Sequence, residues 1–209
     1  WLEANDAGDV AGEWKDKSGR LGHAVANGSP DLISNGFNGL PVMRYSGNNA
    51  GTGRDYHDFG KIGNVRTVFW VWKNSGGWYF MLGDRDNSHF HRQSYMFDST
   101  WASSRVKEGT LRLNGSLVST TSTPFQNQMS IIALRTTGDV SATYFSKDRN
   151  RNNDRFANGD LGELVIYDKP LSDSEMSIVE SYLSQKWGIG GAPSSSSMIT
   201  LAADTVQDE

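Results

Sequence analysis

Short apolar runs separated by turns rich in glycine and asparagine dominate this chain of 209 residues. The run VRTVFWVWK at residues 65–73 is the strongest β signal, because it combines β-branched and aromatic residues. Its almost continuous apolar character predicts a central strand that is covered on both faces. A hairpin-type connection at Ser75-Gly76-Gly77 leads into a second expected strand at residues 78–82. Four further strands are expected over residues 41–45, 129–134, 140–145 and 161–167.

Asparagine–glycine pairs mark the expected turns. Asn114-Gly115 separates two short alternating runs, at residues 111–113 and 116–118. This pairing is the strongest short-range hairpin signal, because both residues tolerate the positive φ angles that a two-residue hairpin turn requires. Residues 35–39 (NGFNG) are expected to form a loop that leads into the strand at residues 41–45.

One helix is expected near the end of the chain. Ser172 and Glu175 have the spacing of a capping box, in which each side chain accepts a hydrogen bond from the other residue's backbone amide. Apolar residues then recur at helical spacing, and Gly188 ends the pattern. The expected buried stripe of this helix consists of Met176, Val179, Leu183 and Trp187.

Composition and charge narrow the possible functions. The chain has 20 Lys and Arg against 24 Asp and Glu, a formal net charge of −4, and no basic block. A nucleic acid partner is therefore not expected, since binding phosphates requires clustered positive charge. No apolar run approaches the 18 residues of a membrane-spanning helix, so no membrane insertion is expected. The absence of cysteine excludes disulfides, thiolate catalysis and cysteine-based zinc sites.

The expected domain boundary follows from a change in composition. Residues 1–190 contain all the strand and helix signals and are interpreted as one domain. Residues 191–209 begin with a serine-rich stretch and are interpreted as a linker and the start of a following segment. The chain begins at Trp1 without a signal-peptide pattern, which suggests a piece of a longer protein.

Two acidic segments are candidates for calcium binding, because calcium prefers carboxylate and amide oxygens. Asp84, Asp86 and Asn87 lie within four residues of one another. A second segment imitates the start of a calcium loop, but it has Asn153 at the sixth position and Gly159 at the twelfth, where that motif has glycine and glutamate. Both segments are also typical of ordinary turns. The oxygen-bearing residues of the second segment are Asp148, Asn150, Asn152 and Asp154.

Residues 84–101 combine acids, histidines, an arginine and aromatics, which is the mixture that a sugar-binding site needs. Trp101 lies in a polar loop and is the best candidate for an exposed ring on which a pyranose could stack. Trp70 and Trp72, by contrast, share one face of the expected central strand and are interpreted as core residues. The predicted ligand-binding residues are Asp84, His91, Arg92 and Trp101, although the histidine and arginine could instead brace the loop. His89 and His91 are also spaced as possible ligands of a transition metal.

Motifs spread over residues 14–188 have the order expected of one known family. They are residues 14–19 (WKDKSG), 41–47 (PVMRYSG), 82–84 with 90–92, Asn114-Gly115, 154–172, Tyr182-Leu183 and 186–188 (KWG). Together they resemble bacterial laminin-G-like modules of the concanavalin A-like lectin/glucanase superfamily. The resemblance implies an all-β, two-sheet antiparallel jelly-roll sandwich with one C-terminal α-helix. It also implies an extracellular or cell-surface location, as in large bacterial adhesins and multi-domain proteins that act on polysaccharides.

The glucanases of this superfamily carry paired carboxylates as Glu-x-Asp-x-x-Glu on one strand, and this sequence contains no Glu-x-Asp. Glu163 is the one acid inside a confidently expected strand, and its expected partner is an arginine or a helix amide. The leading hypothesis is therefore a non-catalytic, calcium-assisted carbohydrate-binding module that binds a glycan as a monomeric part of a longer adhesin. The alternatives are a polysaccharide-active enzyme with an unorthodox site, or a structural or protein-binding module.

Overall fold

The structure is a computed structural model that describes residues 1–6, 13–20, 22–47, 54–76, 81–92, 94–149 and 155–190. It consists mostly of antiparallel β-sheet with one C-terminal helix, which confirms the predicted all-β class. Ten strands, two α-helices and one 3₁₀ turn are formed by the described residues. They are β1 (Leu2–Glu3), η1 (Ala4–Asp6), β2 (Glu13–Trp14), β3 (Ala24–Asn27), β4 (Asp31–Phe37), β5 (Leu40–Ser46), β6 (Tyr56–Gly76), α1 (Ser104–Lys107), β7 (Thr110–Leu113), β8 (Ser116–Val118), β9 (Ser130–Phe145), β10 (Asn158–Tyr167) and α2 (Asp173–Trp187).

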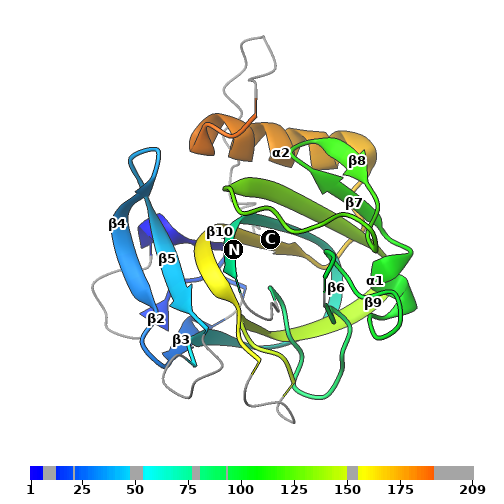
Figure 1. Cartoon of the computed structure of the whole chain (residues 1–209), viewed down its shortest axis with the longest axis horizontal. Coiled ribbons are helices and arrows are strands. Elements are labelled where there is room, and N and C mark those ends of the chain that lie inside the picture. The colour runs from blue at the N-terminus through cyan, green and yellow to red at the C-terminus, as the bar shows by residue number, and fades with distance from the viewer. Residues whose placement is uncertain are drawn as a thin grey trace, which may run out of the picture.

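The strands share one hydrogen-bonded sheet in the order β4-β5-β10-β6-β9-β7-β8, and every pairing is antiparallel. Strand β1 adds to β10, β3 adds to the first part of β6, and β2 pairs with β3. Strands β6 and β9 are by far the longest and form the centre of the sheet (Figure 1).

Strand β6 is buried on both faces over residues 67–72, as the apolar run in its sequence predicts. Val68, Trp70 and Trp72 point into one hydrophobic cluster. The alternating residues Phe69 and Val71 point into a second cluster, on the face that α2 covers. The alternation follows from the period of two along a strand, and it confirms that Trp70 and Trp72 are core residues.

The sheet folds over on itself, so that the ends of its longest strands approach one another. Trp72 pairs with Ser130 at the start of β9, whereas Phe145 is the last residue of the same strand. The Trp72 and Phe145 rings nevertheless lie 5.4 Å apart. The register between β6 and β9 shifts three times between Asp58 and Thr67, which places the bend there. The first cluster fills the space between the two halves.

Helix α2 covers the opposite face of the sheet (Figure 1). The capping box of Ser172 and Glu175 is present, and Gly188 ends the helix in the left-handed conformation, as predicted. The predicted stripe is buried, and Trp187 approaches β10 so closely that a Cβ at Gly162 would collide with its indole. None of the helices in the described part of the chain is long and apolar enough to cross a membrane.

Several local expectations need correction. The strands expected at residues 129–134 and 140–145 are one continuous strand, because Thr136 hydrogen-bonds across the bend to Val65 and Gly138 instead of ending the ladder. Strand β4 was not predicted, and the turn that joins it to β5 is Asn38-Gly39, with positive φ at both residues. The Asn114-Gly115 hairpin is confirmed.

The hairpin expected at Ser75-Gly76-Gly77 was wrong for the residues described there. Strand β6 continues to Gly76, and β9 and β10 already pair with both of its edges. Residues 77–80 lie outside the described residues, while Met81 and Leu82 are buried in a bend. The predicted linker and following segment at residues 191–209 also lie outside the described residues, so that boundary stays a prediction.

Candidate functional site

Trp101 presents an exposed ring on a firmly held backbone. Its backbone amide donates to Asp98 Oδ1 over 2.6 Å, and its carbonyl accepts a hydrogen bond from Ser88 Oγ over 3.2 Å. The residue is nevertheless 62% exposed. A large aromatic ring that a loop holds in water, instead of packing it into the core, is typical of a binding surface.

Backbone hydrogen bonds fix the loop that carries Trp101. His91 and His89 accept through their carbonyls from the amides of Asp98 and Ser103, so the loop is closed at its base. Further along, the amides of Met96 and Phe97 donate to the carbonyls of Thr123 and Thr120. The segment therefore has a defined shape although it contains few residues in regular secondary structure.

A row of polar groups begins beside Trp101. The His91 ring lies 6.5 Å from the Trp101 ring, and its Nε2 lies 3.5 Å from Arg155 Nη1. Arg155 Nη1 in turn donates to Asp148 Oδ2 over 3.4 Å. Burial lowers the pKa of His91, although the charge of Asp148 opposes this shift. His91 is thus favoured in its neutral form, which has one donor and one acceptor nitrogen.

Asp84 is buried and orders its own turn. Its Oδ1 accepts hydrogen bonds from the amides of Asp86 and Asn87, both over 2.8 Å, and from Asn87 Nδ2 over 3.0 Å. Burial raises the pKa of Asp84, but hydrogen bonds from Ser141 and from this turn outweigh that effect and keep the pKa below its ordinary value. Asp84 is therefore ionised at neutral pH.

The structure brings the two predicted acidic segments together. Gly83 and Tyr144 form a backbone bridge, with N–H···O distances of 2.9 and 3.0 Å. A Cβ at Gly83 would collide with the Lys147 carbonyl oxygen, so only glycine permits this approach. The segments that carry Asp84 and Asp148 therefore adjoin one another. Asp148 is also the last member of the row of polar groups that runs from His91 through Arg155. Asn150, Asn152 and Asp154 lie outside the described residues.

The carboxylates described here are engaged with donors from the chain itself. Asp148 lies between Arg149 and Arg155, at 3.6 and 3.4 Å, while the exposed Asp86 lies 3.5 Å from Lys61 Nζ. Calcium needs six to eight oxygen ligands. Within the described ranges, no group of three or more acidic or histidine side chains is placed to hold a metal. Three predicted ligands, Asn150, Asn152 and Asp154, lie outside the described residues, so calcium stays a prediction from the sequence.

The remaining predicted residues have internal partners. Arg92 is buried, its Nε donates to the Tyr95 carbonyl over 2.8 Å, and its guanidinium lies 3.2 Å from the Phe125 ring centroid. Arg92 thus braces the loop, which is one of the two roles considered for it. Burial also lowers the pKa of the half-buried His89.

Two residues near Trp101, Asp98 and Arg155, were missed. Asp98 caps the turn that carries Trp101. The spacing of Asp98 from Thr100 and Trp101 could have revealed that turn. Arg155 had no sequence signal, because the strands alone bring it to His91. Tyr95, which the sequence suggests as a ring of intermediate exposure, is a second exposed ring in the same loop.

Glu163 has different partners from those expected. It is buried, and it accepts hydrogen bonds from Lys186 Nζ over 2.8 Å and from the indoles of Trp187 and Trp1 over 2.9 and 2.7 Å. The predicted partner, an arginine or a helix amide, was therefore wrong. The Glu163 carboxylate thus connects β10 to α2, and both of its oxygens accept hydrogen bonds from within the chain.

Comparisons with known proteins find no matching family model, no matching curated protein and no matching solved structure. The similarity to laminin-G-like modules therefore rests on the sequence motifs alone. The arrangement around Trp101 carries the functional argument that follows.

Proposed function

We propose that this chain is a non-catalytic carbohydrate-binding module that holds a sugar against Trp101. The observation that carries the proposal is an indole that is 62% exposed while its backbone N–H and C=O are both hydrogen-bonded. Such a ring loses little conformational freedom when a ligand covers it. In this proposal the fold is the laminin-G-like jelly roll that the motifs imply.

The groups beside Trp101 suit the chemistry of a sugar. The apolar face of a pyranose stacks on an aromatic ring, and its hydroxyl groups need both donors and acceptors. The partly exposed Arg155 supplies donors, and the exposed Asn87 in the adjoining turn supplies both a donor and an acceptor. The predicted ligand residue His91 is only 5% exposed, so its role in this proposal is to position Arg155. A shallow site of this kind gains only about 1 kcal/mol per hydrogen bond. The affinity is therefore expected between the micromolar and millimolar range.

Calcium dependence and the biological setting rest on sequence arguments only. In this proposal a calcium ion binds near Asp84 and Asp148, and residues 150–154 supply its further oxygen ligands. The resemblance to adhesin modules supports an extracellular role within a longer chain.

A glycan array tests this function. The parent protein is applied in calcium and again in chelator, together with Trp101→Ala and with Leu32→Ala in β4 as an exposed apolar control. The proposal expects binding by the parent and the control and a loss of binding by Trp101→Ala. Loss in chelator would show that calcium participates. Glycan turnover would favour the enzyme alternative, and a blank array in calcium would favour a structural or protein-binding module.

A further inference from the structure

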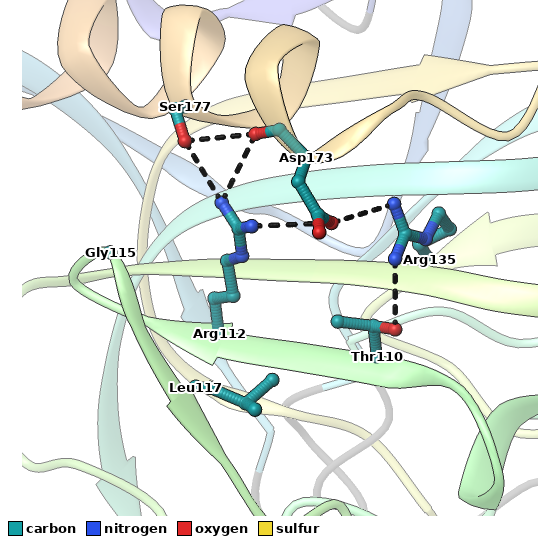
Figure 2. A pocket seen from close by; sticks show the side chains of 7 residues that line it. All are labelled: Thr110, Arg112, Gly115, Leu117, Arg135, Asp173 and Ser177. Atoms are coloured by element: carbon teal, nitrogen blue, oxygen red, sulfur yellow. Dashed lines mark hydrogen bonds and ion pairs between the residues drawn. The ribbon is translucent and has the colours of Figure 1, made fainter.

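A second pocket lies where α2 begins above strands β7 and β9 (Figures 1 and 2). It is an open pocket of about 440 Å³ whose lining includes Thr110, Arg112, Arg135, Asp173 and Leu117. Thr110 and Arg135 are directly paired across the strands, so both arginines rise from the same face of the sheet. The proposed sugar site uses none of these residues.

Both arginines converge on one carboxylate. Asp173 Oδ1 lies 2.9 Å from Arg135 Nη1 and 3.3 Å from Arg112 Nη2. The Asp173 side chain is 71% exposed, whereas those of Arg112 and Arg135 are only 13% and 24% exposed. The positive groups are therefore largely buried, whereas the carboxylate that pairs with them is exposed. Figure 2 shows Asp173 between the two guanidinium groups.

Each guanidinium also forms hydrogen bonds that do not involve the Asp173 side chain. Arg112 Nη1 donates to the buried Glu180 over 3.0 Å and to Ser177 Oγ over 3.1 Å. Arg135 Nη1 donates to the Leu171 carbonyl over 2.8 Å, and its Nη2 donates to Thr110 Oγ1 over 3.2 Å. If the Asp173 side chain turned towards solvent, these hydrogen bonds would keep both guanidinium groups in place. Since Thr110 accepts from Arg135, its own hydroxyl proton remains for a further acceptor.

We infer that this pocket binds an oxyanion group, such as a sulfate or carboxylate, and that Asp173 occupies the site in its absence. Guanidinium forks match the oxygens of such anions in geometry and charge. The position is also the first turn of α2, where the helix dipole favours negative charge. Because the Asp173 side chain is 71% exposed, water screens its attraction to the arginines, so an incoming anion can displace the carboxylate. The exposed Leu117 at the rim offers apolar contact to whatever carries the anion.

Sulfate is the probe for the test, at constant ionic strength and followed through the arginine Nε–H resonances in NMR. A site-specific signal is needed because sulfate stabilises most proteins by exclusion from their surfaces. Asp173→Asn removes the competing carboxylate with little change of shape, and we expect it to bind sulfate about tenfold more tightly than the parent. Asp168→Asn is the matched control, since Asp168 is also an exposed acid paired with an arginine, Arg20, 3.6 Å away.

Two double variants locate the binding. Adding Arg135→Gln to Asp173→Asn should weaken sulfate binding about tenfold, because one fork is lost. If that protein does not fold, Thr110→Val in the same background removes only a hydroxyl and should still weaken binding. Equal sulfate affinity of Asp173→Asn and Asp168→Asn would overturn the inference. The inference would also be overturned if the double variant that folds bound sulfate as tightly as Asp173→Asn alone.

A last comparison identifies what carries the anion. A sulfated monosaccharide that binds Asp173→Asn more tightly than inorganic sulfate supports an acidic glycan, whereas equal affinity supports a free anion. Trp101→Ala should leave sulfate binding unchanged, so failure of this site and failure of the proposed sugar site are distinguishable.

Discussion

Trp72 and Phe145 are in contact, with ring centroids 5.4 Å apart, although Trp72 is paired with the first residue of β9 and Phe145 is its last. Sixteen residues of straight strand would separate these ends by about 50 Å. The contact therefore shows that the sheet folds over on itself around an aromatic core. Tyr45 completes this contact, with its ring 4.9 Å from Phe145.

Truncation of Phe145 tests the contact between the two halves of the folded-over sheet. Phe145→Ala should lower the free energy of unfolding by about 3–5 kcal/mol, because it leaves a cavity between the two halves. Urea denaturation measures this change. Leu117→Ala, at an exposed position, should change stability by no more than about 0.5 kcal/mol. A loss for Phe145→Ala as small as that of the control would contradict the folded-over arrangement.

Glu163 is expected to stabilise the contact between β10 and α2. Glu163→Ala removes one of the two carboxylates that pair with Lys186, the other being Glu3 at 2.6 Å. It also removes the acceptor of the buried Trp187 indole. Leaving a buried donor without its acceptor typically costs about 1–3 kcal/mol. Denaturation of Glu163→Ala beside Glu13→Ala, an exposed glutamate in β2, measures the effect. Equal stability of the two variants would argue against this role.

His57 should make the protein sensitive to acid. Burial lowers the pKa of His57 from 6.5 to about 4, while its Nδ1 forms a 2.7 Å hydrogen bond with the Tyr45 hydroxyl. The unfolded chain therefore binds a proton at a higher pH than the folded chain. Stability from this residue is present above pH 6.5 and decreases as the pH falls towards 4, by about 3 kcal/mol in total.

Unfolding free energies measured from pH 7 to pH 4 test this dependence. His57→Gln should make the unfolding free energy less dependent on pH between 7 and 4. His23→Gln, at an exposed position, should keep the same pH dependence as the parent protein. Identical slopes for all three proteins would show that His57 is not responsible.

Features encoded by neighbouring residues could be predicted from the sequence, and those created by distant contacts could not. The α2 caps and the Asn114-Gly115 turn depend on a few adjacent residues, and both were found. Asn38-Gly39 carried the same signal, but the competing Asn35-Gly36 pair concealed which of the two forms the turn.

The bend in β9 shows the limit of local patterns. Thr136 to Asp139 is polar and looks like a turn between two strands, yet Thr136 is bonded to β6 and the strand continues. In the candidate site, the exposure of Trp101 was predictable from its polar loop. The link from His91 through Arg155 to Asp148 was not, because His91 and Arg155 are 64 residues apart in the sequence.

The account depends most on Trp101 as the surface that binds a sugar. Its most direct test is a calorimetric titration of the parent, Trp101→Phe and Trp101→Ala with the glycan that gives the strongest array signal. By analogy with bases stacked on aromatic rings, Trp101→Ala should lose about 1–3 kcal/mol of binding free energy, with Trp101→Phe in between. The melting temperatures should stay close to that of the parent, because the ring is exposed. Unchanged affinity in Trp101→Ala, or unfolding of that variant, would contradict the account.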